Sequence, residues 1–128
     1  MMADLTDFGF EGLKTPEQVA EVLEAKEGTV LVVVNSVCGC AAANARPAAK
    51  LAIQNEKSPN KTVTVFAGVD KAAVNKARDF FAPYPPSSPC MALFKDGRLV
   101  HFVERHHIEG RPAQMIADNL IGAFNEFC

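Results

Sequence analysis

The fold is decided between Val30 and Cys40, where the sequence reads VLVVVNSVCGC. Its first half is a run of aliphatic residues that does not alternate with polar ones, which is typical of a β-strand buried on both faces. Cys38 and Cys40 follow with one glycine between them, and the small residues AAANA come directly after. Because alanine is the best helix former, the stretch predicts a strand, a turn that carries two thiols, and a helix.

This predicted turn favours a reactive sulfur atom. The first N–H groups of a helix have no partner within the helix, and together with the helix dipole they favour a negative charge nearby. The thiolate is such a charge, and it is the nucleophilic form of cysteine. We therefore expect Cys38 to be a nucleophile with a lowered pKa.

Composition places the chain among ordinary globular domains. It has 128 residues, of which 48% are hydrophobic and 22% charged, and a net charge of −2, which predicts a single domain over residues 1–128. No basic stripe points to nucleic acid, and no apolar run is long enough to cross a membrane. The N-terminal residues lack the pattern of a signal peptide, so we expect a cytoplasmic protein.

The four cysteines then point to chemistry or to metal binding, because structural disulfides are rare in the cytoplasm. The sequence does not determine the oligomeric state.

The remaining sequence predicts three further strands and three further helices. Thr15, Pro16 and Gln18 form the signature of a capped helix start, and Asp96-Gly97 between two alternating runs is a strong hairpin signal. Residues 4–14 are predicted to be an irregular lead-in. The predicted strands are 29–34, 61–67, 90–95 and 98–104. The predicted helices are 16–26, 41–55 with a bend or break at Pro47, 70–81, and 111–127.

This order of elements predicts an α/β fold. A strand, a helix and a second strand imply two parallel strands with a right-handed crossover, and the hairpin adds two antiparallel strands. We expect a central mixed four-stranded sheet flanked by helices, with an extra N-terminal helix. In the last helix, the residues expected to face the core are Met115, Ile116, Leu120, Ala123 and Phe124.

A cysteine pair after the first buried strand, with Ser88-Pro89 just before the hairpin, resembles the thioredoxin fold, in which this proline is cis and lies beside the reactive cysteine. The whole chain resembles the bacilliredoxin family of thioredoxin-like proteins more specifically. The motifs that carry this resemblance are NSVCGCA (35–41), RPA (46–48), PSSP (86–89), LFKDG (93–97) and ERHHIEGR (104–111).

The resemblance implies a thiol–disulfide oxidoreductase that removes the low-mass thiol bacillithiol from oxidised proteins. Cys38 would attack the mixed disulfide, and Cys40 or a second bacillithiol molecule would resolve it. Gly39, Ser88 and Pro89 would contact the substrate. The implied partners are bacillithiolated client proteins, and bacillithiol is a co-substrate, with no other cofactor and no metal.

Other functions remain compatible with the residues. The chain would also suit a general disulfide reductase or isomerase that uses another thiol, or a non-catalytic thioredoxin-fold module that binds a metal or a partner. For a metal, Cys38 and Cys40 together with His106 and His107 offer four ligands, although the usual paired Cys-x-x-Cys spacing is missing. The paired cysteines would otherwise be small buried hydrophobic residues.

Three features near the ends of the later elements have two interpretations each. Cys90 follows Pro89 and is either a third thiol near Cys38 or, the interpretation we favour, a buried cysteine at the start of a strand. Cys128 is expected to be an exposed terminal thiol rather than a catalytic partner. The segment 104–111 is either a solvated connector or a surface that recognises the carboxylates of bacillithiol through Arg105 or Arg111.

Overall fold

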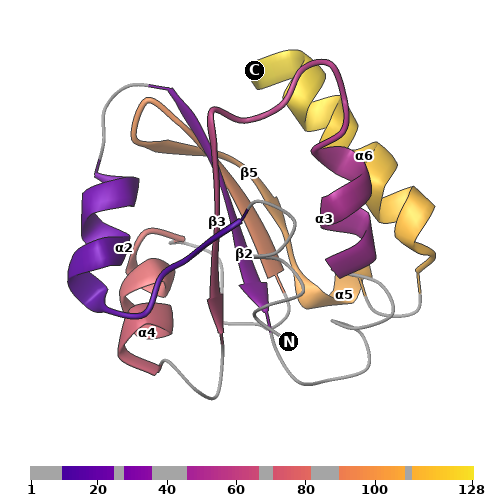
Figure 1. The fold of residues 1–128 in the computed structure, drawn as a ribbon. Coiled ribbons are helices and arrows are strands. Elements are labelled where there is room, and N and C mark those ends of the chain that lie inside the picture. Colours follow the sequence, from indigo (N-terminus) through magenta and orange to yellow (C-terminus); the bar gives the residue numbers. More distant parts are fainter. Residues whose placement is uncertain (1–9, 25–27, 36–45, 67–70, 82–89, 109–110) are drawn as a thin grey trace.

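A computed structural model describes residues 10–24, 28–35, 46–66, 71–81, 90–108 and 111–128 of the chain. In these residues a mixed sheet lies between two layers of helices (Figure 1). The strands are β1 (Glu11–Gly12), β2 (Thr29–Asn35), β3 (Lys61–Phe66), β4 (Cys90–Lys95) and β5 (Arg98–Val103). The helices are α2 (Pro16–Leu23), α3 (Arg46–Ala52), α4 (Lys71–Asp79), α5 (Arg105–Ile108) and α6 (Ala113–Phe127).

Strand β2 lies at the centre of the sheet, whose order is β1-β3-β2-β4-β5. It runs parallel to β3 and antiparallel to β4. Val30, Val32 and Val34 belong to one core cluster, whereas Leu31 and Val33 belong to the other, so both faces of the strand are buried. This double burial explains why the β2 sequence does not alternate between apolar and polar residues.

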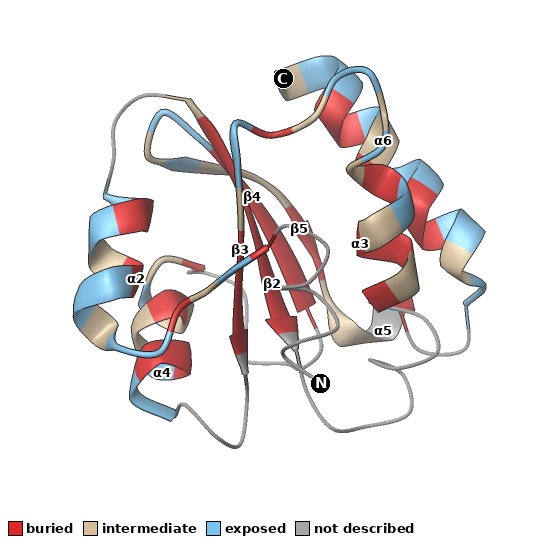
Figure 2. Cartoon of the chain, viewed as in Figure 1, coloured by how far each residue is buried: buried red, intermediate tan, exposed pale blue. Residues whose placement is uncertain are grey.

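The two helix layers cover opposite faces of the sheet. Helices α2 and α4 pack on the face of Val32, while α3, α5 and α6 pack on the face of Leu31. Figure 2 shows the buried residues on the strands and on the sides of the helices that face them. The predicted α/β class with helices flanking a mixed sheet is confirmed.

The sheet has one strand more than predicted. Strand β1 pairs in parallel with β3, with Glu11 opposite Val63 and Gly12 opposite Thr64, and the Leu13 N–H continues the pairing by donating to the Thr64 carbonyl at 2.9 Å. Residues 4–14 were predicted to be an irregular lead-in. The prediction missed β1, because a strand of two residues is too short to show an alternating pattern.

The predicted start of α2 is confirmed in detail. The Gln18 N–H donates to Thr15 Oγ1 at 3.2 Å, and the Thr15 N–H donates to Gln18 Oε1 at 3.3 Å. This reciprocal pair is a capping box, which satisfies two backbone donors that the helix leaves without partners.

The predicted hairpin is also confirmed. Asp96 and Gly97 have φ values of 52° and 82°, as a two-residue turn of type I′ requires. Asp96 additionally holds the start of β2, because its N–H donates to the Gly28 carbonyl at 2.8 Å and its Oδ1 accepts from the Gly28 N–H at 2.9 Å.

Strand β5 contains a β-bulge that the sequence pattern did not reveal. Leu93 pairs with His101 and Phe94 pairs with Leu99, so Val100 has no partner in β4. Val100 packs against the cluster on the α6 side, and the next residue, His101, faces the same way, since its Nε2 lies 2.7 Å from Oδ1 of Asn119 in α6. The extra residue thus places two successive side chains on one face.

One predicted core residue is wrong. Met115 is 52% exposed, whereas Ile116, Leu120 and Phe124 are at most 1% exposed. The buried stripe of α6 includes Ala117, which was not predicted, because alanine gives only a weak pattern. Met115 lies one position before this stripe, about 100° around the helix from Ile116.

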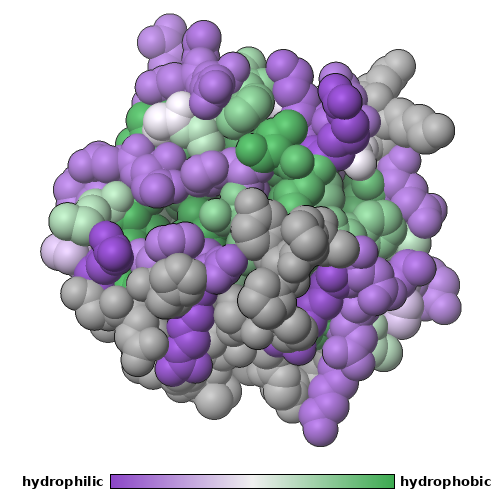
Figure 3. All heavy atoms as spheres, turned by 180° about the vertical axis from the view of Figure 1, so that it is seen from behind, coloured by the Kyte–Doolittle hydropathy of each residue, from purple (hydrophilic) through white to green (hydrophobic). Residues whose placement is uncertain are grey.

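Helix α3 is described only from Arg46 onwards. Residues 41–45 lie outside the described residues, so the bend or break at Pro47 stays a prediction. Asp70, at the start of the predicted helix 70–81, also lies outside them. Seen from behind, with the β5 edge toward the viewer, the molecule shows an apolar patch bordered by hydrophilic side chains (Figure 3). The large apolar side chains that are exposed in the described part are Leu51 and Met115.

Candidate active site

The residues predicted to perform the chemistry lie outside the described residues. These residues are Cys38, Gly39, Cys40, Ser88 and Pro89. The structure does describe the elements to which they are joined: β2 ends at Asn35, β4 begins at Cys90 and α3 begins at Arg46. The site is therefore defined here by the end of the sheet from which these segments leave.

That end of the sheet brings the two predicted motifs to neighbouring strands. Strands β2 and β4 are antiparallel, and Val34 lies opposite Cys90. Adjacent strands are about 4.8 Å apart. The segment that contains Cys38 leaves β2 one residue after Val34, and the segment that ends in Pro89 enters β4 at Cys90. Both segments are thus attached at the same end of adjacent strands, as the resemblance to thioredoxin implies.

Two further strands end at the same place. Phe66, the last residue of β3, lies opposite Asn35, and Val103, the last residue of β5, lies opposite Met91. We call this the β2 end of the sheet, defined by Asn35, Phe66, Cys90 and Val103. Ligands of open α/β sheets bind beyond the carboxyl ends of the strands, so the position suits a functional site.

Cys90 is a buried residue of the core. Its side chain is 1% exposed, and it lies in the cluster on the α2 and α4 face together with Val34 and Ala92. The interpretation as a buried cysteine at the start of a strand is confirmed. Cys128 is exposed at the end of α6, as expected.

The segment after β5 forms the short helix α5 at the β2 end of the sheet. Ile108 is fully buried in the cluster on the α3 and α6 face, which settles the side of the sheet that this segment faces. The Glu104 N–H donates to His107 Nδ1 at 3.2 Å, and the His107 N–H donates to the Glu104 carbonyl at 2.9 Å. This pair fixes the first turn of α5 and leaves the His107 side chain exposed.

The two arginines of this segment differ in exposure. Arg105 is half-buried, whereas Arg111 is exposed and its Nη1 lies 3.8 Å from Met115 Sδ. Their predicted contact with bacillithiol stays a prediction. Within the residues described, no three His, Cys, Asp or Glu side chains come together as a metal site. Of the four ligands considered for a bound metal, Cys38, Cys40 and the side chain of His106 lie outside the described residues.

The burial of Arg46 was not predicted, since the sequence analysis named this residue only within the motif RPA (46–48). It is 7% exposed, and no other charged residue in the described part of the chain is buried. The sequence shows only that it directly precedes Pro47. The pattern alone does not reveal burial, because arginine is rarely buried.

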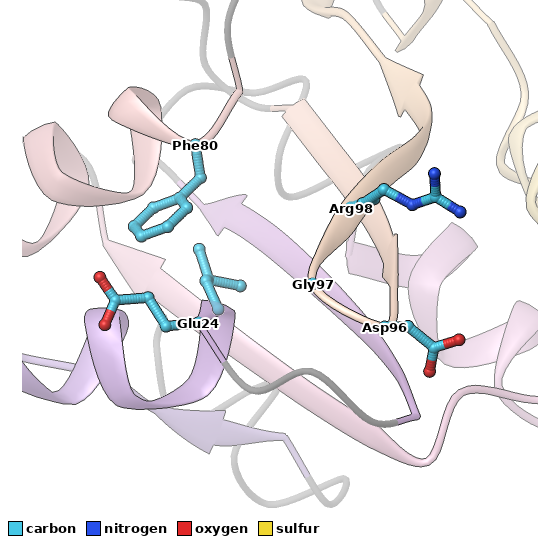
Figure 4. Close-up of a pocket in the computed structure, with 6 residues that line it drawn as sticks. Glu24, Phe80, Asp96, Gly97 and Arg98 are labelled. Atoms are coloured by element: carbon cyan, nitrogen blue, oxygen red, sulfur yellow. The ribbon is translucent and has the colours of Figure 1, made fainter.

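The cavities found among the described residues lie elsewhere. A hollow of about 570 Å³ is lined by the end of α2, Phe80 and the β4–β5 turn (Figure 4). The side chains of Asp96 and Arg98 point away from Phe80, so the polar groups of this hollow do not converge as they do in ligand sites. A smaller hollow of about 240 Å³ lies between α2 and α4. No helix in the described ranges has the length and apolar character needed to span a membrane.

Thioredoxins are among the solved structures that resemble this fold. Thioredoxin from Schistosoma mansoni is 19% identical and superposes with a TM-score of 0.64, covering 93% of this chain and 98% of its own. Thioredoxin from Fasciola hepatica is 15% identical with a TM-score of 0.63, covering 93% of this chain and all of its own. At these identities the likeness establishes the thioredoxin fold alone.

The sequence comparisons identify the family. A model of the disulphide isomerase family matches residues 1–128. The bacilliredoxin of Cytophaga hutchinsonii is 58% identical over 98% of this chain and 93% of its own length. The bacilliredoxin of Bacillus cereus is 53% identical over all of this chain and 90% of its own length.

Fold and family together define the class of protein, a thioredoxin-fold thiol–disulfide oxidoreductase. Within that class, the chain belongs to the bacilliredoxin family.

Proposed function

We propose that this protein removes bacillithiol from mixed disulfides on oxidised proteins, with Cys38 as the attacking and Cys40 as the resolving cysteine. The observation that carries the proposal is the similarity to proteins named bacilliredoxin, at 58% and 53% identity over essentially the whole chain. The cysteine pair also follows the central strand of the sheet, three and five positions after Asn35.

The reaction proceeds by two thiol–disulfide exchanges. The Cys38 thiolate attacks the bacillithiol sulfur of the mixed disulfide, and the client protein leaves as a thiolate. Cys38 then carries bacillithiol. The Cys40 thiolate attacks Cys38 Sγ, which forms a Cys38–Cys40 disulfide and releases bacillithiol as a thiolate.

Two molecules of bacillithiol return the protein to its reduced form and leave as bacillithiol disulfide. Alternatively, a second bacillithiol attacks the bacillithiol on Cys38 directly and frees that thiolate. In both routes the sulfur atoms carry the electrons, so bacillithiol is a co-substrate and no bound cofactor takes part. Gly39, Ser88 and Pro89 are the proposed contacts to the substrate, and the cytoplasm is the proposed location.

The cysteine substitutions test this mechanism. In a Cys128→Ser background, which removes the exposed terminal thiol, Cys38→Ser should abolish the release of bacillithiol from a bacillithiolated client. Cys40→Ser should retain the first exchange and accumulate protein that carries one bacillithiol on Cys38, detected by intact mass. Cys128→Ser alone is the matched control and should react at the wild-type rate.

Other results would select the alternatives. Equal rates with bacillithiol and with glutathione would favour a general reductase or isomerase. Unchanged behaviour of both Cys38→Ser and Cys40→Ser would contradict the proposal and favour a binding module, and stoichiometric zinc in the reduced protein would then identify a metal site.

A further inference from the structure

Met115 is an exposed methionine whose sulfur atom lies beside a cation. Its side chain is 52% exposed, whereas Met91 of β4 is 1% exposed and belongs to the core. Arg111 donates through Nη1 to Met115 Sδ at a distance of 3.8 Å. A thioether sulfur is only a weak hydrogen-bond acceptor, so this contact satisfies the guanidinium poorly. A stronger acceptor bonded to the same sulfur would therefore be stabilised at this position.

The start of α6 adds to the positive environment of this sulfur. Met115 is the third residue of the helix, which begins at Ala113. Pro112, which precedes the helix, forms no side-chain cap, and the first turn contains no acidic residue. A helix N-terminus carries a partial positive charge and favours negative charge in its first turn. An oxygen atom with a partial negative charge on Met115 would compensate this charge together with that of Arg111.

The groups one turn further along α6 already have other partners. Asp118 Oδ1 accepts a hydrogen bond from Gln114 Nε2 at 2.9 Å, and Asn119 Oδ1 lies 2.7 Å from His101 Nε2. Within the described ranges of the chain, Arg111 forms no ion pair with a carboxylate. Its guanidinium can therefore bind an acceptor that appears on the neighbouring sulfur.

We propose that Met115 is a site of reversible oxidation, at which a hydroperoxide converts the thioether to a sulfoxide that Arg111 binds. A lone pair of the sulfur attacks the terminal oxygen of the hydroperoxide, so that an S–O bond forms and the O–O bond breaks. The proton of the transferred oxygen passes to the departing oxygen. Sulfur loses two electrons, and the hydroperoxide is reduced to an alcohol, or to water if it is hydrogen peroxide.

Oxidation at this position should stabilise the protein. A sulfoxide disrupts a core because it places a polar group among apolar side chains, and Met91 would suffer this effect. On Met115 the new oxygen lies in solvent and accepts a charge-assisted hydrogen bond from Arg111, which is stronger than the N–H···S contact that it replaces. No step of this reaction uses Cys38, so the inference does not depend on the proposed function.

The first test uses the wild-type protein and hydrogen peroxide. Peptide mass spectrometry should show that Met115 gains an oxygen atom at least about tenfold faster than Met91, which reacts only when the core opens. The oxidised protein should unfold at a temperature about 1–3 °C higher than the untreated protein. Methionine sulfoxide reductases A and B together should reverse this gain, because they act on the sulfoxide.

Three variants separate the contribution of Arg111 from other effects of peroxide. Met115→Leu undergoes the same treatment and should show no gain, so it measures any change that arises at the cysteines. Arg111→Gln should lose the gain in unfolding temperature, because the cation that binds the sulfoxide is gone. Arg98→Gln, the matched control, removes an exposed guanidinium beside the β4–β5 turn and should keep the full gain.

Three results would overturn the inference. The first is oxidation of Met91 as fast as that of Met115. The second is an unfolding temperature that falls on oxidation and recovers with the reductases, which would show that the sulfoxide is destabilising. The third is a gain of the same size in Arg111→Gln as in wild type. Each is independent of the proposed function, which fails only if Cys38→Ser keeps its activity.

Discussion

At the scale of single residues, two glycines differ in whether the structure has room for a side chain at their position. Gly28 has a φ of +88°, and a Cβ atom added there would lie 2.9 Å from Asn60 Oδ1. That oxygen accepts hydrogen bonds from the N–H and Oγ1 of Thr29, so it cannot move aside without losing them. Gly122 lies within α6, and an added Cβ would meet no atom within 4 Å.

Alanine substitutions should therefore change stability in opposite directions. Gly28→Ala should lower the free energy of unfolding by about 1–3 kcal/mol, because the left-handed backbone and the contact with Asn60 are both unfavourable. Gly122→Ala should raise it by about 0.4–1 kcal/mol, because alanine is the better helix former and restricts the unfolded chain. Urea unfolding measures both, and an unchanged midpoint for Gly28→Ala would contradict the constraint.

Individual residues of the site were predictable where chain order decides their place. The burial of Cys90 and the exposure of Cys128 followed from their positions at the start of a strand and at the end of the chain. The burial of Arg46 did not, because it depends on how α3 packs against other elements. Likewise, the sequence alone did not show which face of the sheet α5 covers, since that depends on where Ile108, the buried residue of this four-residue helix, inserts into the core.

At the scale of elements, α6 explains why Met115 was assigned wrongly. The helix buries a stripe that contains two alanines, Ala117 and Ala123. Met115 seemed the better core residue on hydrophobicity alone, yet the geometry of the helix turns it toward solvent, where it lies beside Arg111. Side-chain size misleads where a small residue occupies the core position.

This assignment predicts unequal effects of substitution at adjacent positions. Met115→Gln should change the free energy of unfolding by less than about 0.5 kcal/mol, because the side chain is already in solvent. Ile116→Ala should lower it by about 2–5 kcal/mol, because it opens a cavity in the core. Thermal unfolding of the two variants, followed by circular dichroism, makes the comparison. A loss of stability in Met115→Gln as large as in Ile116→Ala would show that Met115 packs in the core.

The larger elements were predictable because each has a local signal. The capping box, the Asp-Gly turn and the unbroken apolar run of β2 fixed their elements before any tertiary contact was known. Strand β1 and the bulge in β5 lack such signals. The first depends on pairing with β3, more than 50 residues away in the chain, and the second is defined only by the register against β4.

At the scale of the whole molecule, the β2 end and the β4–β5 turn are at opposite ends of the sheet. Lys95, which pairs with Arg98, is five residues along β4 from Cys90, a distance of about 17 Å at 3.4 Å per residue. This exceeds the screening length of about 8 Å at physiological salt. Charged side chains that line the hollow of Figure 4 are therefore screened from groups at the β2 end of the sheet.

Removing a charge from that hollow should leave the chemistry intact. Arg98→Gln should release bacillithiol from a model client within about twofold of the wild-type rate, because the exposed guanidinium is too distant to affect a thiol near the β2 end. Steady-state assays at 0.15 M salt measure this. A tenfold loss of rate with unchanged stability would instead connect the hollow to catalysis.

The unpaired Val100 has a consequence for how molecules of this protein meet one another. In the described part of the chain β5 is the outermost strand on its side, and a straight outermost strand offers its free backbone groups to a neighbouring molecule as a template for sheet growth. The irregularity at Val100 breaks that template partway along its length. One surplus residue therefore helps to keep separate copies from assembling into a shared sheet in a crowded solution.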